Sequence, residues 1–586
     1  MKYLFICLTV ALTASAGMIT PRLVDQMETA RADAMIDIFV KPAGDVDCGY
    51  VAQATAGFSR ADRREFAVSV MKAVAEQTQA PILESLKAWP SESVTGLHTN
   101  WLANFISCSA TVDAIRDMAS LECVAWVDFR PATCPFIEPI DVRPANPDEL
   151  SRANAWGVDK IGAPAVWALG YDGEGIVVAV IDTGVNYNHL DLRTHMWHDT
   201  PANLHYGWDM ASGDGDPMDE SGHGTHCAGS VASDGTAGTV CGVAPGATIM
   251  AVRVLTSVSP DAEVNVMDGF QWAVDHGADV LSTSLGYIPA WNPQRALWRT
   301  AEENILAAGV PHSIAAGNEG PGSATLRTPG DCPPPWRHPD QVAPGAPSAC
   351  ICVGATTSSD AIASFSSHGP ANWETIAPWY DYDDTPPNAG LLRPDVCAPG
   401  EDVLSCNYQN TSGYTTKSGT SMATPHNAGL MALMLHADAA STLTPALIDE
   451  ILETTALDLG TSGKDNTYGA GRIQALQAVQ AVIYHGIGGG SGSSSMTTPS
   501  LLLSSAMPNP VSTTCAFSLY MAEPGAVNLS VYDIHGRKIA LVTEGEMGSG
   551  NHTIEFVVPY GLGNGVYFLR ASGCGSSATS RFTVIK

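Results

Sequence analysis

The chain has 586 residues, of which 45% are hydrophobic and 15% are charged, and its formal net charge is −31. This length exceeds what one hydrophobic core fills and predicts two or three domains, while the composition is that of a folded chain and not of a disordered one. The excess of acidic residues argues against nucleic acid or an anionic membrane as a partner. No interior segment is apolar over the length of a membrane span.

Residues 1–16 have the pattern of a signal peptide. Lys2 supplies a positive start, residues 3–12 are mostly apolar, and Ala14-Ser15-Ala16 forms a small-residue cleavage site. The apolar stretch is too short for a membrane anchor. We therefore expect a secreted protein, extracellular or at the cell surface, with no membrane span in the mature chain.

An exported chain can form disulfides. Of its fourteen cysteines one, Cys7, lies in the signal peptide, so an odd number remains and at least one thiol stays unpaired. We expect that thiol to be Cys227. Plausible pairs, which the sequence does not fix, are Cys397 with Cys406, Cys332 with Cys350 or Cys352, and Cys515 with Cys574.

Residues 17–145 are predicted to form a separate α+β unit. Short runs of strand formers alternate with segments whose apolar residues have helical spacing. The expected elements are strands over 35–40, 102–108 and 123–129 and helices over 62–78 and 112–121.

Residues 176–181 form a continuous apolar run, which is typical of a parallel strand buried on both faces. Asp182 follows at the carboxyl end of this run, where open α/β sheets place their functional sites. The alternative is that Asp182 only stabilises the next turn, as aspartate often does.

The segment 219–229, with sequence Asp-Glu-Ser-Gly-His-Gly-Thr-His-Cys-Ala-Gly, places His223 between two glycines that let other backbone approach its ring. His226 follows three residues later, but the segment lacks the H-E-x-x-H pattern of zinc peptidases. We therefore expect His226 to be a packed helix residue and not a metal ligand.

The segment 416–426, with sequence Thr-Lys-Ser-Gly-Thr-Ser-Met-Ala-Thr-Pro-His, predicts a tight turn followed at once by a helix. The backbone N–H of Ser421 would then point forward from a helix N-terminus, where developing negative charge is stabilised. That is the environment of a nucleophilic serine. Taken alone, the segment could be an ordinary helix cap.

Together these motifs resemble the subtilisin family of serine endopeptidases. Their order along the chain, acid then histidine then serine, is the order of that family. A further segment, 314–320, resembles the family strand that ends in the oxyanion-hole asparagine, here Asn318. The resemblance covers about residues 151–485 and implies an α/β catalytic domain over 146–485 with a mostly parallel sheet between helices.

The resemblance also implies the residue roles. Ser421 would be the nucleophile, His223 the general base, Asp182 its orienting acid, and Asn318 an oxyanion donor. The extended substrate would lie along two segments that border the cleft, and main-chain pairing of this kind predicts broad specificity. No acidic residue clearly matches the one with which related enzymes select basic substrates. Glu319 is the one residue for which this role stays open. These substrate-binding residues are Ser284, Leu285, Gly286, Ala315, Ala316 and Gly317.

Two further expectations come with the family. Residues 17–145 are similar to subtilase propeptides, which would assist folding and block the cleft until removal; the alternative is a retained binding domain. The acidic loop 209–219 is similar to a calcium loop of thermitase-like members, with Asp209, Asp214 and Asp216 as oxygen ligands. The alternative is a solvated acidic loop, and no organic cofactor is expected.

The composition changes after residue 485. Residues 486–500 are a Gly/Ser-rich linker, and residues 501–586 contain five acidic and five basic residues with short alternating runs, which predict a small β-sandwich. Residues 507–510, 531–537 and 584–586 resemble the C-terminal sorting domain of the type IX secretion system, with the Ig-like domain of flagellar hook-capping proteins a close second.

The sequence therefore predicts a secreted serine endopeptidase that hydrolyses proteins through an acyl-enzyme and is made as a self-processed precursor. Its partners would be protein or peptide substrates, its own propeptide and bacterial secretion machinery. The rival is a surface binding protein built on an inactive protease scaffold. The presence of all four residues Asp182, His223, Asn318 and Ser421 favours the enzyme.

Overall fold

A computed structural model describes residues 17–586 except 32, 133–138, 257–261, 339–340, 342–345, 387, 440, 488–500, 504–510, 522–523, 534–536, 560, 574–575 and 585. The chain forms two compact units, residues 1–489 and 490–586. The expected signal peptide and most of the expected linker fall outside the described residues. None of the described helices is both long and apolar enough to cross a membrane.

The N-terminal part of the first unit is an α+β layer. Its five-stranded sheet has the order β1-β5-β2-β4-β3 and is antiparallel except for the β1–β5 pair. Helix α3 begins after Ser59, whose hydroxyl caps it by accepting from the N–H of Asp62, and continues beyond the predicted 62–78. The elements are β1 Met18–Ile19, α1 Pro21–Thr29, β2 Ile36–Pro42, α2 Cys48–Ala54, α3 Arg60–Lys87, β3 Val94–Asn100, β4 Phe105–Ala110, α4 Val112–Ala119 and β5 Val124–Phe129.

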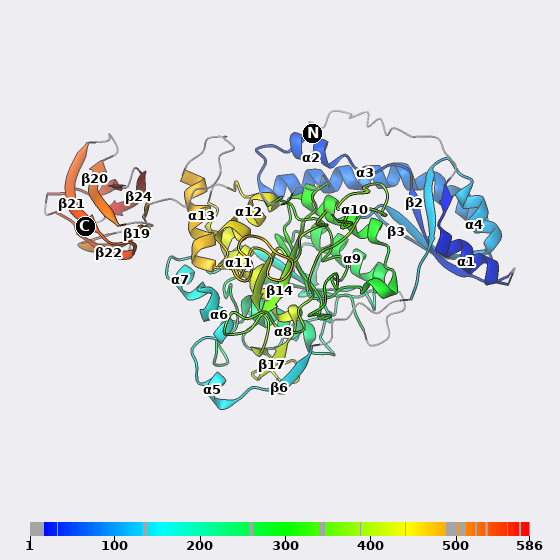
Figure 1. The fold of residues 1–586 in the computed structure, drawn as a ribbon, viewed down its shortest axis with the longest axis horizontal. Coiled ribbons are helices and arrows are strands. Elements are labelled where there is room, and N and C mark those ends of the chain that lie inside the picture. Colours follow the sequence, from blue (N-terminus) through cyan, green and yellow to red (C-terminus); the bar gives the residue numbers. More distant parts are fainter. Residues whose placement is uncertain are drawn as a thin grey trace. The chain divides into compact units, whose positions relative to one another are not determined.

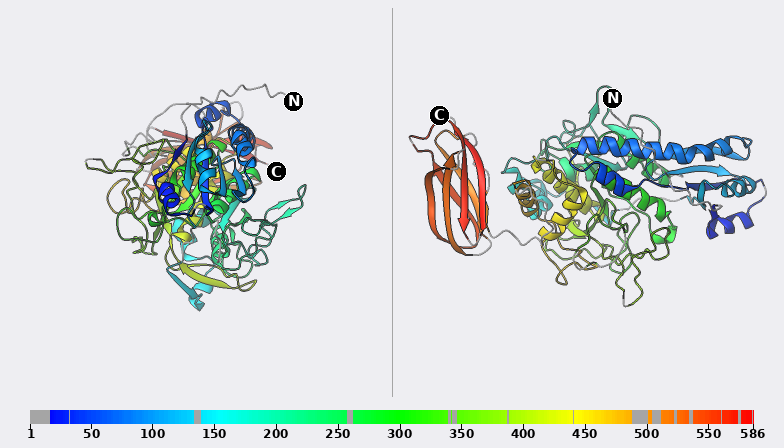
Figure 2. Two further views of the ribbon diagram at one scale, coloured as in Figure 1. Left: turned by 90° about the vertical axis from the view of Figure 1, so that its right-hand side faces the viewer. Right: turned by 90° about the horizontal axis from the view of Figure 1, so that it is seen from above.

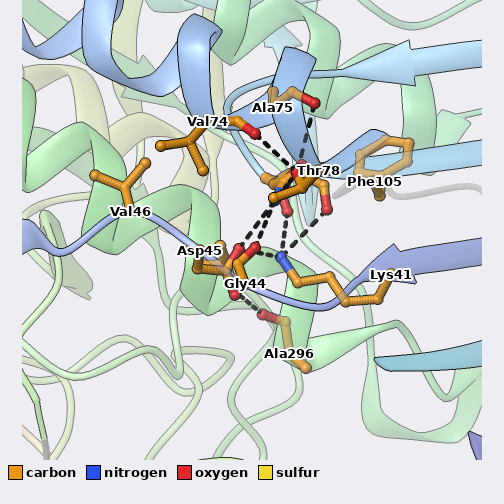
Figure 3. Close-up of polar contacts among 12 residues, drawn as sticks. Lys41, Gly44, Asp45, Val46, Val74, Ala75, Thr78, Phe105 and Ala296 are labelled. Atoms are coloured by element: carbon orange, nitrogen blue, oxygen red, sulfur yellow. Dashed lines mark hydrogen bonds and ion pairs between the residues drawn. The ribbon is translucent and has the colours of Figure 1, made fainter. Parts of the chain in front are cut away.

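A buried lysine joins the elements of this layer (Figure 3). The Nζ of Lys41 pairs with Asp45 and donates to the backbone oxygens of Ala103 and Asn104 over 3.0 and 3.2 Å. Asn104 in turn donates to Thr78 on α3. Because Lys41 is only 6% exposed, these partners compensate the burial of its charge.

Helix α3 lies along α9 and α10 of the catalytic domain in Figures 1 and 2. Apolar residues of both parts, among them Phe39, Met71 and Trp298, form one continuous cluster. Polar contacts also fix the position of α3 on the catalytic domain, among them the ion pair between Lys72 and Asp275 at 2.7 Å. The N-terminal layer therefore shares a core with the catalytic domain.

The catalytic domain is built on a seven-stranded, entirely parallel sheet of order β10-β11-β7-β12-β13-β14-β15, which confirms the predicted α/β class with a parallel sheet. Strand β7 lies between β11 and β12, and the strands that follow it in the chain are added on both of its sides. At such a switch point open α/β sheets form their functional sites. The strands are β7 Val177–Asp182, β10 Gly207–Asp209, β11 Thr248–Arg253, β12 Val280–Thr283, β13 His312–Ala315, β14 Cys350–Thr356 and β15 Val396–Pro399.

Helices cover both faces of this sheet. Alternate residues of β7 enter different cores: Val178 and Val180 contact the cluster that contains α8 and α11, while Ala179 and Ile181 contact the one that contains α9 and α10. The helices are α5 Pro147–Leu150, α6 Trp156–Ile161, α7 Ala163–Trp167, α8 His223–Ala232, α9 Ala262–Asp275, the short 3-10 helix η1 Pro289–Trp291, α10 Arg295–Ala308, α11 Thr420–Ala437, α12 Pro445–Thr455 and α13 Ala475–Ile487.

A small antiparallel sheet of order β16-β17-β6 adjoins the catalytic domain. Its edge strand β6 comes from the segment that follows the N-terminal layer, and its middle strand β17 leads directly into α11. The remaining strands are β6 Asp141–Pro144, β16 Val403–Cys406, β17 Tyr414–Ser418 and the short pair β8 His198–Asp199 and β9 Leu204–His205.

The second unit consists of two antiparallel sheets that share one apolar cluster, which includes Phe517, Leu529 and Phe582. Their strand orders are β18-β19-β22 and β21-β20-β23-β24. The strands are β18 Leu501–Leu503, β19 Thr514–Met521, β20 Gly525–Asp533, β21 Lys538–Met547, β22 Gly550–Val557, β23 Gly565–Gly573 and β24 Ser576–Val584.

The suggested cysteine pairs within the catalytic domain are wrong in this structure, because all eleven cysteines among the described residues, Cys227 included, are free thiols. Cys397 packs against Gly354 on the neighbouring strand, whereas Cys406 packs against Gly229 on α8. Cys332 is likewise unpaired with Cys350 or Cys352. Cys574, the suggested partner of Cys515, lies outside the described residues.

Candidate active site

Asp182 and His223 meet at the switch point of the sheet. Asp182 is the last residue of β7, and His223 is the first residue of α8. The Nδ1 of His223 lies 2.7 and 2.9 Å from the two carboxylate oxygens of Asp182, and each side chain is only 1% exposed. Burial strengthens this contact and fixes the orientation of the imidazole ring.

Two glycines permit this close approach. A Cβ on Gly224 would lie 2.1 Å from the backbone oxygen of Gly184 and 3.1 Å from the Cβ of Asp182. Gly222 has a φ of +88°, in the left-handed region that favours glycine. Gly224 therefore permits the contact between α8 and the end of β7, and Gly222 permits the turn that leads into α8.

Asp219 holds the turn before His223. Its Oδ1 accepts from the hydroxyl of Thr183 and from the N–H groups of Ser221 and Gly222, and its Oδ2 accepts from the N–H and the hydroxyl of Thr225. Thr183 directly follows Asp182, so one buried carboxylate joins the ends of β7 and α8. The sequence analysis included Asp219 only as the last residue of the acidic loop 209–219, because the donors that meet its carboxylate are brought together only by the fold.

Ser421 lies in the first turn of α11, as predicted. It is fully buried, and its hydroxyl donates to the backbone oxygen of Ser284 over 3.2 Å, while the hydroxyl of Ser284 donates to the backbone oxygen of Ser421 over 2.9 Å. Cys227 joins this group to the acid–histidine pair, because its Sγ lies 3.4 Å from the oxygen of Ser421 and 3.9 Å from Nδ1 of His223.

Asn318 lies beside the same helix N-terminus. Its Oδ1 accepts from both the N–H and the hydroxyl of Thr420, each over 2.9 Å. Because the oxygen end of the amide accepts these bonds, Nδ2 is the donor end of the side chain, the end that an oxyanion would bind.

The two expected substrate-binding segments also lie here. Ser284, Leu285 and Gly286 follow β12, while Ala315 ends β13 and is followed by Ala316 and Gly317. Gly317 donates its N–H to the hydroxyl of Thr420 over 3.2 Å. The structure thus brings all of the predicted catalytic and substrate-binding positions to the carboxyl ends of β7, β12 and β13 and the starts of α8 and α11.

Comparison with known proteins agrees with this arrangement. A family model described as the subtilase family matches residues 173–471, about half of the chain. The chain belongs to the subtilase family. Its match to this family and to subtilisin and serine protease relatives makes this subtilase a serine-type endopeptidase.

Three relatives show the extent of the match. Subtilisin E of Bacillus subtilis (strain 168) is 34% identical over 333 residues, which are 57% of this chain and 73% of the relative. Serine protease AprX of the same organism is 33% identical over 338 residues, 52% of this chain and 66% of the relative, just under two thirds of its length. Bacillopeptidase F is 28% identical over 455 residues, 72% of this chain but only 29% of the relative.

Two other histidines of the subtilase have structural partners. His226 is fully buried with its Nε2 3.0 Å from the backbone oxygen of Val403, and burial lowers its pKa well below the ordinary value. In His426, Nδ1 lies 2.8 Å from the oxygen of Met422, and burial lowers the pKa to about 4. Both rings are therefore neutral packing residues near pH 7.

The acidic loop predicted to bind calcium divides into two parts. Asp209 is buried, and its carboxylate already binds Arg253 over 3.0 Å and accepts the N–H groups of Ala211 and Ser212. In this arrangement Asp209 does not fit the role of a calcium ligand. Asp214 and Asp216 are exposed, so their carboxylates remain the candidate ligands and calcium at this loop stays a prediction.

Proposed function

We propose that this subtilase is a secreted endopeptidase whose triad is Asp182, His223 and Ser421. The observation that carries the proposal is the buried 2.7 Å contact between Asp182 and Nδ1 of His223, located next to the helix turn that holds Ser421. This contact leaves Nε2 as the nitrogen that exchanges the catalytic proton.

The reaction follows from these positions. The Ser421 hydroxyl turns from the Ser284 oxygen toward Nε2 of His223, loses its proton to it and attacks the peptide carbonyl. Asp182 stabilises the imidazolium, while the Ser421 N–H and the Asn318 amide bind the oxyanion. His223 then protonates the leaving amine, and a water molecule hydrolyses the acyl-enzyme by the same steps in reverse order.

We also propose that the N-terminal layer is a propeptide that the enzyme removes from itself. In support, the chain that leaves this layer runs along the active site: Ile140 donates its N–H to the oxygen of Ser418 over 2.8 Å, and β6 then pairs antiparallel with β17. A pocket of about 430 Å³ at this place is lined by Pro139, Val142, Ser221, Gly222, His223, Asn407, Tyr408, Gln409, Thr415 and Lys417. The alternative of a retained binding domain predicts no cleavage after this layer.

Delivery is the proposed role of the two ends of the chain. Export would use the signal pattern of residues 1–16, and residues 501–586 would serve sorting through bacterial secretion machinery. The support is the sequence resemblance together with the separation of residues 490–586 as a compact unit.

The triad is tested with Ser421→Ala, with the exposed Ser412→Ala as a matched control. We expect Ser421→Ala to lose hydrolysis of a denatured protein and labelling by a fluorophosphonate, and to accumulate as an uncleaved precursor. Ser412→Ala should retain all three properties. Hydrolysis by the purified Ser421→Ala protein would contradict the triad, and normal maturation of that protein expressed alone would contradict self-processing.

A further inference from the structure

Three buried side chains that can bind a metal ion meet where α8, the end of β16 and the segment that follows β7 come together. They are His189, Asp191 and Cys406, each 0% exposed, and one ligand atom from each lies within 4.8 Å of the other two. A Cβ on Gly229 of α8 would lie 2.8 Å from the Sγ of Cys406, so this glycine leaves room for the thiol. None of the three side chains takes part in the proposed peptidase mechanism.

The hydrogen bonds of His189 fix its tautomer. Its Nε2 lies 2.9 Å from the backbone oxygen of Gly413 and therefore carries the proton, whereas Nδ1 accepts the N–H of Asp191 over 3.3 Å and therefore carries the lone pair. A metal-binding histidine typically donates its other N–H to a backbone carbonyl in this way. Nδ1 can thus become a metal ligand at the loss of one long hydrogen bond.

Asp191 is a buried carboxylate whose described donors are all neutral. Its Oδ2 accepts the hydroxyls of Ser233 and Tyr414 over 2.8 Å each, and its Oδ1 accepts the N–H of Ala237 over 2.6 Å. No lysine or arginine pairs with Asp191 in the part of the chain that the structure describes. Three donors leave one of the four lone pairs of the carboxylate for a further partner, and burial of the charge favours a cation in that place.

Cys406 supplies a soft donor. It is a free thiol, and burial, the neighbouring Cys241 and the Asp191 carboxylate all raise its pKa well above the ordinary value. Such a thiol binds a metal ion as the thiolate, so its proton passes to the solvent as the sulfur–metal bond forms. A donor set of one nitrogen, one oxygen and one sulfur suits Zn²⁺, which binds all three, and not Ca²⁺, which takes oxygen ligands.

We propose that His189, Asp191 and Cys406 bind one Zn²⁺ ion in a structural site that is separate from the peptidase chemistry. Ligand atoms of one tetrahedral zinc ion lie about 3.3 to 3.8 Å apart, so these three need to approach one another by no more than about 1.5 Å. The inference does not depend on the proposed peptidase activity, because it rests on the donor set alone.

The position of the site gives the ion a structural role. The first two ligands follow β7, which ends in Asp182, and Leu190 between them donates its N–H to the oxygen of Thr411 over 2.8 Å. Thr411 lies between β16 and β17, and β17 leads into α11 with Ser421. A metal ion would therefore link the segments that carry two of the proposed triad residues, and it would stabilise the native state because it binds only that state.

The test uses Co²⁺, which takes the same ligands as Zn²⁺ and gives a sulfur-to-cobalt absorption band when a thiolate binds it. The full-length precursor with Ser421→Ala, which prevents self-digestion, is produced in medium that contains Co²⁺ or lacks transition metals. The variants added to this parent are Cys406→Ala and His189→Gln. Cys227→Ala is the matched control, because it removes an equally buried thiol that lies beside the proposed catalytic histidine.

We expect the parent and Cys227→Ala to contain about one Co²⁺ per chain, to show the band and to melt at least about 5 °C above the metal-free protein. Cys406→Ala and His189→Gln should lose the metal, the band and the shift. If Cys406→Ala shows no cooperative melting, His189→Gln, which keeps the thiol, decides the question. Absence of metal from the parent, its loss in Cys227→Ala alone, or an equal shift with Ca²⁺ and no band would overturn the inference.

Discussion

The backbone N–H and the hydroxyl of Thr420 both donate to the side-chain oxygen of Asn318, each over 2.9 Å. These two bonds fix the orientation of the Asn318 amide, with its oxygen toward Thr420. An oxyanion donor must be oriented before charge develops, because reorientation during the reaction would cost part of the stabilisation. Thr420 is thus a positioning residue for Asn318.

The first prediction concerns Thr420→Val, which removes the hydroxyl but keeps the shape and the N–H. We expect kcat to fall about tenfold with little change in KM, because one of two orienting hydrogen bonds is lost. Asn318→Ala should cost about 10²–10³ in kcat, a magnitude taken over from the equivalent asparagine of subtilisin.

The matched control is Thr424→Val on the same helix. Thr424 is equally buried, but its hydroxyl donates to the backbone oxygen of Thr420 and not to Asn318. Equal loss of kcat in the two valine variants would show that Thr420 acts through helix stability alone.

The second prediction concerns Asp219→Asn. An amide nitrogen cannot accept the donors that converge on this carboxylate, so at least two hydrogen bonds that hold the turn before His223 are lost. We expect a lower thermal midpoint and a lower kcat at unchanged substrate affinity. Asp148→Asn, at an exposed position of α5, should change neither, and a normal kcat for Asp219→Asn would contradict the positioning role.

The sequence predicts the central part of this site well. The uninterrupted apolar run before Asp182 indicates a buried parallel strand, and the glycines around His223 indicate a close backbone approach. Both signals are local, because each depends on neighbouring residues in the chain. The parallel sheet and the placement of Asn318 and Ser421 follow from the order of such segments.

The contacts between distant segments could not be predicted in this way. Thr420 and Asn318 are separated by 102 residues, and no periodicity links them. The same holds for β6 and β17, which pair although residues 144 and 415 lie far apart in the chain. The predicted cysteine pairs were wrong because closeness in sequence does not show which sheet a residue joins. Cys397 and Cys406 are close in sequence, but Cys397 belongs to the parallel sheet and Cys406 to the small antiparallel one.

The third prediction concerns pH and the docking of the N-terminal layer. His98 of this layer lies 2.9 Å from Asp268 on α9. Burial acts to lower the pKa of His98, but the Asp268 carboxylate raises it by more, and the net direction is upward. The docked layer therefore favours protonated His98. The contribution of His98 to the stability of docking is complete below its ordinary pKa of about 6.5, and it is lost as the pH rises through the pKa of the docked state.

The measurement is the dissociation constant of the cleaved but still associated layer at about pH 5.5 and about pH 8.5, on either side of this titration. Association should be weaker at the higher pH. His98→Gln keeps a donor to Asp268 but does not titrate, so it should reduce the difference between the two values. The same pH dependence in His98→Gln would assign it to other groups.

The fourth prediction concerns calcium at the acidic loop. If Asp214 and Asp216 bind calcium, a chelator should lower the thermal midpoint, because a ligand that binds only the native state stabilises it. The double substitution of these residues by alanine should remove that dependence. Asp209→Asn should lower the midpoint equally with and without chelator, because it breaks the buried pair with Arg253. Identical melting of the wild type in both conditions would favour a solvated loop.

The last prediction is that residues 490–586 contribute nothing to the chemistry. This unit has its own apolar cluster around Phe517, Leu529 and Phe582, and residues 501–586 carry equal numbers of acidic and basic residues. A chain that ends at Gly489 keeps α13 complete, and we expect it to mature and to retain wild-type kcat/KM on a soluble peptide. Its thermal midpoint should change by less than about 2 °C, because a unit that folds around a separate core adds little to the stability of the other. In the native host the same chain should lose export or surface retention. A large loss of turnover or stability on truncation would mean that the second unit supports the catalytic domain, and its proposed role in delivery would then fail.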